Sequence, residues 1–541
     1  MNQGKGTIAA DFACYDGERQ TQLEQTRKAV WLCGLSRLLP WSNQKRPSYY
    51  RDEGPYQSTG RLGVAYATTA LHLAMYPPLQ PFFREEMDVG ARMELEARGD
   101  EGIRAIVAHE QKLRMREIAI QAVIESAGSD ASNNTPALGF AGANYRHLMQ
   151  LVATGSSMRY VDDDERVHVI RRNDFVTRRD TDGRIHETIC RTFKDAMALT
   201  PEVQAAARIV KSELEGKKRD EREVEIYTHA EWQPQSKVWE IIQEINGWEI
   251  NRVERKFSPY IPSEFELWPG DHEGRGLPDQ LFADLSSYDQ TRERFLDWIY
   301  AATQLTPVID MGSEVLEEDL DPYNAGRTNG VPIRARVQGG QVQDIGYLQL
   351  NKVADFKVAF DLHEVLRGDL AKLMVIKADL APKGEAGRSS EAWRQFSMYV
   401  NEATQGLYGQ LVDNEHTPLI QYMRWRLEAK GILPAIPPGS ARPRLLVGVA
   451  AMARQAQALG ITDVLAVMAQ FDPAAREKFD PTVLAEVLMR YRNIDTPGVI
   501  KTSTMLQQEA NAKAQLAGQT AAATSAGDAL GQVAVGALTN Q

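Results

Sequence analysis

Three basic residues, Lys377, Lys383 and Arg388, lie in the segment 377–390, which is too rich in Gly and Pro to form a regular helix or strand. Cations on such a loop can contact phosphate groups without reading the order of bases. The segment therefore predicts contacts with the backbone of a nucleic acid. A solvated surface loop is the alternative interpretation.

Two acidic clusters could offer carboxylate oxygens to a divalent cation. Asp162–Glu165 follows a predicted strand, and Asp271-His272-Glu273 lies between glycines. We interpret the first as a solvated turn and the second as a loop, and so we predict no metal site. A third acidic set lies farther along the chain, and we expect it to be solvated or to face a partner: Glu314, Glu317, Glu318, Asp319 and Asp321.

Sequence motifs of common enzyme classes are absent. The chain has no GxxxxGK phosphate loop, no HExxH, no GxSxG, and no GxGxxG that opens a helix after a strand. Its nine histidines show no metal-ligand spacing. Cys14, Cys33 and Cys190 are scattered without a CxxC pair, which is typical of reduced thiols. We therefore predict a protein that is not an enzyme and that has no cofactor.

Length and composition indicate a soluble protein of several domains. At 541 residues the chain is too long for one compact core. Its hydrophobic content of 43% and charged content of 25% are ordinary for a soluble protein. The net charge of −11 argues against a wholly basic nucleic-acid binder but leaves room for a locally basic site. No signal-like segment or run of about 18 apolar residues is present, so we expect a reducing, aqueous compartment and no membrane span.

Two helices are expected to position the basic loop. Apolar residues recur at helical spacing in 277–304 and again in 357–376. Residues 305–356, which lie between them, have turn signals and little helical periodicity. Two long helices that bracket a distal excursion and lead into the loop 377–390 predict a rod with a head at one end.

The rest of the chain predicts an α+β protein that is mainly helical. Alternating residues and the turn Asp180–Gly183 indicate antiparallel strands within 157–260. The final segment, from residue 505, is rich in Ala and Gln and is either disordered or a thin helix. Further helices are expected at 23–39, 56–78, 92–127, 141–154, 201–214, 390–431 and, after a proline-rich linker at 434–443, within 445–492.

Several stretches, in their order and spacing, together resemble the portal, or head-to-tail connector, proteins of short-tailed bacteriophages of the T-seven-like group. The resemblance runs from about residue 20 to the Ala-rich tail. The stretches are Tyr56-Gln-Ser-Thr-Gly, Ala70-Leu-His-Leu-Ala-Met-Tyr-Pro-Pro78, Phe82-Phe83, Val224-Glu-Ile-Tyr-Thr-His229, Pro259-Tyr-Ile-Pro262, Gly274-Arg-Gly276 and Tyr347-Leu-Gln-Leu-Asn-Lys-Val-Ala-Asp-Phe356.

The resemblance implies the phage portal fold, assembled as a ring, usually a dodecamer, at one vertex of the viral head. Double-stranded DNA would pass through the ring during packaging and ejection, with Lys377, Lys383 and Arg388 facing it. The implied parts are a wing (1–276, with its β-rich part at 157–260), two stem helices (277–304 and 357–376), a clip (305–356), a tunnel loop (377–390), a long wing helix (391–434), a crown (435–495) and a barrel helix (496–541).

The same resemblance implies partners and a location. The partners are DNA bound without sequence specificity, the terminase large subunit, tail adaptor and tail tube proteins, and the major capsid and scaffolding proteins. The acidic set at 314–321 would lie in the clip that docks the motor and then the tail. The location would be the portal vertex of the virion, after assembly in the host cytoplasm. Two other functions stay open: a virion scaffold or adaptor without a channel, and a metal-dependent nuclease that uses Asp162–Glu165.

Overall fold

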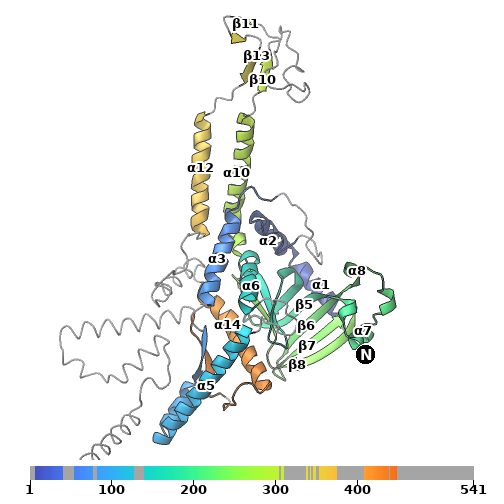
Figure 1. Ribbon diagram of the computed structural model, residues 1–541, viewed down its shortest axis with the longest axis vertical. Helices are drawn as coiled ribbons and strands as arrows, with labels where there is room; N and C mark the ends of the chain where they lie inside the picture. The colour runs from blue at the N-terminus through green and yellow to red at the C-terminus, as the bar shows by residue number, and fades with distance from the viewer. Residues whose placement is uncertain are drawn as a thin grey trace, which may run out of the picture. The chain divides into compact units, whose positions relative to one another are not determined.

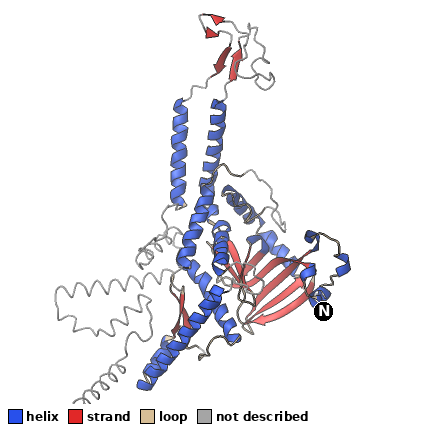
Figure 2. Cartoon of the chain, viewed as in Figure 1, coloured by secondary structure: helices blue, strands red, loops and turns tan. Residues whose placement is uncertain are grey.

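The structure is a computed structural model that describes residues 7–40, 54–76, 82–126, 139–303, 306–309, 337–338, 341–342, 345–348, 353–374, 407–437 and 439–447. Two compact units are distinguished. The first comprises Met1–Asp88 and Arg114–Gly448, and the second comprises Val89–Leu113 and Val449–Gln541. Helices and strands both contribute to the described part of the chain, as the α+β prediction requires (Figure 2).

An antiparallel five-stranded sheet, ordered β4-β5-β6-β7-β8, confirms the strands predicted within 157–260 (Figure 1). The predicted hairpin turn joins β4 to β5, and in it Asp180 Oδ1 accepts hydrogen bonds from the backbone N–H groups of Asp182 and Arg184. A second sheet has the order β3-β2-β9. The strands are β2 (Ser156–Val161), β3 (Val167–Ile170), β4 (Phe175–Arg179), β5 (Ile185–Asp195), β6 (Glu223–Gln233), β7 (Val238–Ile245), β8 (Trp248–Arg255) and β9 (Tyr260–Glu264).

A helix that the sequence analysis did not predict covers part of the five-stranded sheet. In α1 (Ile8–Glu18), the Thr7 side chain accepts a hydrogen bond from the backbone N–H of Ala10 and so caps the first turn. Phe12 is buried against Val176 and Ile189 of the sheet. The sequence did not indicate this helix because the N-terminal segment has no long apolar stripe. A tertiary contact with the sheet holds the helix in place.

The helix predicted at 201–214 is shorter than expected. The structure has α7 (Pro201–Ala206) and then two short elements, the 3-10 turn Lys211–Glu213 and α8 (Arg219–Arg222). Arg208 adopts a φ of 54°, a left-handed conformation that a helix cannot continue through. Two further 3-10 turns, Arg172–Asp174 and Ala196–Ala198, lie next to the strands.

The main hydrophobic core of the first unit lies among helices that the periodicity largely predicted. Leu71, Leu151 and Ile420 are fully buried in it. The aromatic pair at 82–83 packs at the C-terminal end of α3, where the rings of Phe82 and Tyr76, the residue that follows the helix, lie 5.4 Å apart. These helices are α2 (Gln20–Leu32), α3 (Thr59–Met75), α6 (Phe140–Thr154) and α14 (Leu407–Ala429).

A buried ion pair fixes α14 in this core. Glu415 contacts the Arg159 guanidinium at 2.5 Å and the His147 ring at 2.9 Å, and all three side chains are almost fully buried. Burial alone would raise the pKa of Glu415, but Arg159 and His147 hold it well below its usual value. Pro418 lies inside α14 without ending it. Residues 390–406 of the predicted helix lie outside the described residues.

One prediction about the C-terminal linker is wrong in part. Residues at the end of the proline-rich stretch form β14 (Ala441–Leu445), which pairs with β1 (Phe83–Met87). The two-stranded pair tolerates Pro443 because proline fits a strand that has a free edge. The first unit accordingly extends to Gly448, beyond the boundary expected at 434. Residues 448–541, which include most of the expected crown and the whole barrel helix, lie outside the described residues.

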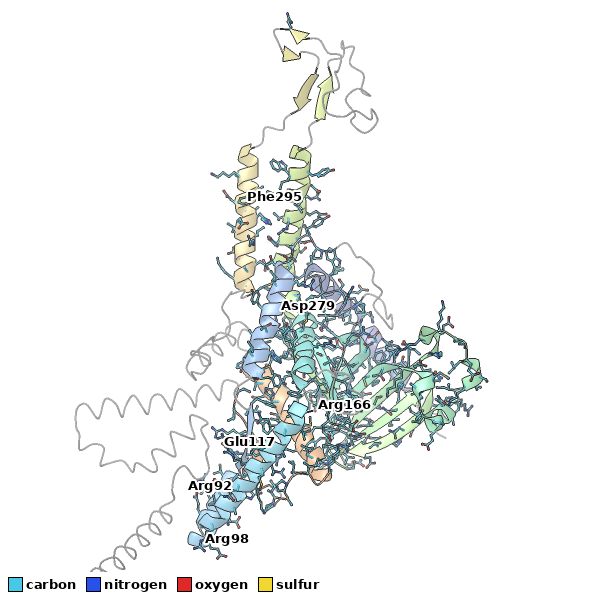
Figure 3. The ribbon with its side chains drawn as sticks, in the orientation of Figure 1. Arg92, Arg98, Glu117, Arg166, Asp279 and Phe295 are labelled. Atoms are coloured by element: carbon cyan, nitrogen blue, oxygen red, sulfur yellow. The ribbon has the colours of Figure 1, made fainter. Side chains whose placement is uncertain are left out.

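The long charged helix predicted at 92–127 is divided. It consists of α4 (Val89–Glu96) and α5 (Asp100–Ser126), and Gly99 between them has a φ of 68°. Arg92 and Arg98 are labelled in Figure 3. Arg92 forms an ion pair with Glu96 within α4, and Arg98, just after the helix, forms one with Glu94. A glycine in the left-handed conformation ends the first helix, and the chain then starts the second.

Candidate functional site

The two helices predicted to form a rod are present and lie side by side. The first consists of a short turn, α9 (Leu277–Gln280), and then α10 (Phe282–Thr303), and the second is α12 (Val353–Leu373) (Figure 1). At their distal end the chain continues into an antiparallel strand pair, β10 (Thr306–Ile309) with β13 (Ile345–Leu348). The short strands β11 (Val337–Gln338) and β12 (Gln341–Val342) pair within the excursion. The sequence did not predict these strands.

Two glycines of α3 contact the first turn of α10 and the residue that follows the last turn of α12. A side chain at Gly60 would meet Leu285 of α10 at 3.0 Å, and a side chain at Gly63 would meet the Cβ of Met374, just after α12, at 2.7 Å. Both Leu285 and Met374 are buried. The absence of a Cβ at these two positions lets α10 and α12 approach the same side of α3.

An aromatic contact joins α10 to α12 farther along. The His363 ring of α12 stacks on Tyr288 at 5.0 Å and on Phe295 at 5.7 Å, both from α10, and Phe295 is labelled in Figure 3. Phe360 lies 6.3 Å from the same Phe295 ring. Later residues of α12 meet earlier residues of α10, so the helices run antiparallel. His363 is only 7% exposed.

The electrostatic surroundings of His363 favour its neutral form. Burial lowers the pKa of His363, and the positive charges of Arg292 and Arg367 lower it further, while Glu364 opposes them. The Nδ1 atom of His363 is buried and has no hydrogen-bond partner among the described residues. A proton added to this ring would place a charge between two aromatic rings and close to two arginines.

Both helices also carry large apolar side chains that are exposed to solvent. Tyr300 of α10 is 70% exposed and Val358 of α12 is 69% exposed. We name two sets: the α10 strip is Phe282, Leu296 and Tyr300, and the α12 strip is Val358, Leu362, Val365 and Leu373.

The sequence identified the apolar residues of α12 but not their division between two surfaces. Leu366, Leu370 and Met374 recur at helical spacing on the inward side, where they are half-buried or buried. Val365 and Leu373 of the α12 strip each lie one position before an inward residue, Leu366 and Met374 respectively. The signal was available, because together these residues span a wider arc than the roughly 100° of a single core-facing stripe.

The structure does not describe the residues predicted to contact DNA or partners. Lys377, Lys383 and Arg388 follow the end of α12 and lie outside the described residues. The acidic residues at 314–321 are also outside them, in the excursion that the β10–β13 pair closes at its base. Their predicted roles therefore stay predictions.

Two carboxylates of the acidic cluster at 162–165 form ion pairs with cationic side chains. Asp163 pairs with Arg426 at 2.8 Å, and Glu165 pairs with Lys430 at 2.6 Å. Asp162 accepts hydrogen bonds from the backbone of its own turn. Among the described residues, no group of three or more His, Cys, Asp or Glu side chains is arranged to hold a metal ion.

The loop at 271–273 contains a buried ion-pair centre that the sequence did not reveal. Glu273 pairs with Arg19 and, at 2.9 Å, with Arg172, and it is 4% exposed. Burial alone would raise the pKa of Glu273, but the two arginines hold it below its usual value. The partners lie far away in the chain, so no local pattern could have predicted them.

Comparison with known proteins gives consistent matches along the chain. Residues 6–500 match the family model described as "Bacteriophage head to tail connecting protein". The portal protein of Escherichia phage T7 is 23% identical over 468 residues, which cover 84% of this chain and 81% of that protein. The portal protein of Enterobacteria phage T3 is 23% identical over 496 residues, covering 90% and 86%.

A third similar protein is the portal protein of Pseudomonas phage phiKMV, 22% identical over 482 residues, which cover 87% of this chain and 88% of that protein. Among solved structures, a chain from the neck of an empty gene transfer agent particle computed with C6 symmetry has a TM-score of 0.37. It is 10% identical and covers 75% of this chain and 85% of that one. None of the described helices is long and apolar enough to span a membrane.

Proposed function

The chain belongs to the bacteriophage head to tail connecting protein family, and from this premise we propose how it performs the role of a portal protein. The portal protein is a component of the virion at the junction of head and tail. We propose that copies of the chain form a ring whose channel conducts double-stranded DNA during packaging and ejection. The observation that carries the proposal is the match to portal proteins along most of the chain.

In this proposal each part of the chain has a place in the ring. Helices α10 and α12 are the part of the channel wall that one copy contributes. Their exposed apolar side chains support that assignment, because this part of the wall has a neighbouring copy on each side. The β1–β14 pair adds residues 441–445 to the wing. The remaining assignment is wing 1–276 with 391–434, stem 277–304 and 357–376, clip 305–356, tunnel loop 377–390, crown 435–495 apart from residues 441–445, and barrel 496–541.

The channel should hold its cargo weakly. Every phosphate contact adds affinity and slows the movement of DNA, so a conduit works best with few cations on an acidic background. The net charge of −11 per copy supplies such a background. We propose that Lys377, Lys383 and Arg388 face the channel and contact DNA without sequence specificity.

A triple replacement by alanine tests the loop. Lys377→Ala, Lys383→Ala and Arg388→Ala together should alter DNA packaging or retention while the ring still assembles. Packaging is measured as DNA protected from nuclease in filled heads, and assembly is measured by negative-stain microscopy. Normal packaging and retention in the triple variant would show that these cations do not act on DNA.

A matched control removes the same charge elsewhere. Lys211, Lys217 and Lys218 are exposed cations on the segment between β5 and β6. Their joint replacement by alanine changes the net charge of each copy equally and should leave packaging unchanged. An equal loss in both triple variants would indicate an effect of total charge rather than of the loop.

The clip would dock the terminase motor and then the tail proteins, with the acidic set Glu314, Glu317, Glu318, Asp319 and Asp321 on its surface. We propose that the chain itself performs no catalytic turnover, so that a separate ATPase supplies the energy of packaging. The nuclease alternative has little support, because Asp163 and Glu165 are paired with cationic side chains. A metal-dependent DNA degradation assay on the purified protein distinguishes the two.

A further inference from the structure

Within one copy, a histidine marks the limit of the buried contact between α10 and α12. Near α3, Leu370 and Met374 on the inward side of α12 are buried. Farther along, His363 is also buried, but residues 357–362 of α12 are all exposed, and none of residues 296–300 of α10 is buried. Within these ranges, His363 is therefore the outermost side chain of α12 that the pair buries.

The His363 ring fills the space between two rings of α10. Its centroid lies 5.0 Å from that of Tyr288 and 5.7 Å from that of Phe295, and the ring planes are inclined by only 19° and 5°. Tyr288 and Phe295 are seven residues apart in α10, so about 10.5 Å separates them along the helix. That spacing accommodates one flat ring, and the imidazole occupies it.

The surroundings of the His363 ring do not compensate a positive charge. Its Nδ1 atom is buried without a hydrogen-bond partner among the described residues. Arg292 of α10 and Arg367 of α12 lie near the ring, and Glu364 is already paired with Arg367 at 3.4 Å. The carboxylate of Asp289 accepts hydrogen bonds from the backbone before α3. Burial and the two arginines lower the pKa of His363.

We propose that His363 acts as a pH-sensitive switch: its neutral ring keeps α10 and α12 together at this level, and its protonated ring leaves the gap so that the helices separate there. The contacts of both helices with Gly60 and Gly63 of α3 stay closed, because the side chains that make them do not titrate in the acid range. The β10–β13 strand pair stays closed for the same reason. The switch lies within one copy, so it does not rest on the proposed function.

The direction of the switch follows from proton binding. In the open arrangement His363 is solvated, and its pKa returns to the ordinary value of about 6.5. The closed arrangement is fully favoured above that value. As the pH falls from about 6.5 toward the lowered pKa of the closed arrangement, the ratio of closed to open molecules falls by up to about tenfold per pH unit.

Spin labels on the full-length protein measure the opening. The exposed Cys14 is replaced by serine, and the other two native cysteines are buried. Leu296→Cys with Ala359→Cys places one label on each helix, at exposed positions close to the level of His363. The distance between the labels, measured by pulsed electron paramagnetic resonance, should be short and uniform at about pH 8, and a longer distance should appear below about pH 6.5. Excess unlabelled protein restricts the measurement to distances within one copy.

A second label pair reports on the contacts near α3. Ala283→Cys with Lys372→Cys also uses exposed positions, and its distance should stay constant over the same pH range. Separation of both label pairs together would indicate general unfolding and would overturn the proposal. A first label pair that keeps its short distance down to about pH 4 would overturn it as well.

Substitutions near the ring test the role of the proton. His363→Phe keeps a flat ring in the gap but cannot be protonated, so the short distance should persist at every pH. Arg292→Gln removes a positive charge that α10 presents to the closed ring, so it should reduce the fraction of open molecules in acid. Arg294→Gln removes the same charge from an exposed position of α10 and should open like the unmodified protein. Unchanged acid opening in His363→Phe, or equal open fractions in the two arginine variants, would contradict the proposal.

Discussion

Replacing Gly63 by alanine tests whether α3 fixes the position of α12. The added methyl would contact the Met374 Sδ and would lie 2.7 Å from Met374 Cβ and 2.9 Å from Cγ. The sulfur end of the side chain can rotate away, but the Cβ is attached directly to the backbone. The change therefore forces the end of α12 to move or leaves the contact overpacked.

The expected magnitude follows from two opposing effects. Overpacking a buried contact costs about 1–3 kcal/mol. Alanine in a helix interior is favoured over glycine by about 0.5–1 kcal/mol, which offsets part of that cost. Gly63→Ala should therefore lower the free energy of unfolding by about 0.5–2 kcal/mol.

Gly368 offers a matched control within α12. A methyl there would have nothing within 4 Å, so Gly368→Ala makes the same chemical change without the clash. It should raise stability by about 0.5–1 kcal/mol. The difference between the two variants isolates the cost of the clash at Gly63.

The assay is thermal unfolding of both variants and the unmodified protein at equal concentration and in the same assembly state. Gly63→Ala should lower the midpoint temperature by a few degrees, and Gly368→Ala should raise it. A change of 1 kcal/mol in the free energy of unfolding shifts the midpoint of a domain of about 150–250 residues by roughly 2–4 °C. Equal upward shifts in both variants would refute the idea that Gly63 is a contact point. The start of α10 and the end of α12 would then not be fixed by α3.

Three further changes test other contacts. Glu273→Gln removes the charge between Arg19 and Arg172 and should cost about 3–5 kcal/mol, because the buried Arg172 loses its carboxylate partner and Arg19 keeps only Asp16; a loss under about 1 kcal/mol in urea unfolding would contradict this. Because the pKa of His363 is lowered in the folded state, its stabilising contribution is present above its unfolded pKa of about 6.5 and is lost as pH falls through the folded value. His363→Phe should flatten that part of the pH–stability curve, and an unchanged slope would contradict the argument. Tyr408→Phe removes a 2.9 Å hydrogen bond to the buried carbonyl of Ala74 in α3 and should cost about 1–2 kcal/mol in urea unfolding.

The local pattern of the sequence predicted most long elements. Helical spacing located α3, α6, α10 and α12, and the alternation of residues located the strands around the turn at Asp180. Residues with positive φ caused the main errors, because Gly99 divides one predicted helix and Arg208 shortens another. The sequence does not indicate that a helix breaks at Arg208, because arginine rarely adopts a positive φ.

Contacts between distant segments were beyond the reach of sequence patterns. The stretch before Leu445 was expected to be a linker because it contains several prolines, yet its end pairs with β1. The cluster at Asp271–Glu273 was expected to be a loop, and the burial of Glu273 between two arginines depends on the packing of α1, α2 and the sheets. Such pairings are set by tertiary contacts, which a local window does not contain.

The sequence by itself determined most of the long helices and the strands around Asp180, that two long helices enclose an excursion and precede a basic segment, and that the chain resembles phage portal proteins. Only the tertiary structure decided how the apolar residues of those helices divide. His363 faces α10 while Leu362, its neighbour in sequence, faces solvent. The reason is physical: periodicity defines the faces of a helix, but packing against a second helix decides which face is buried and which is left for a partner.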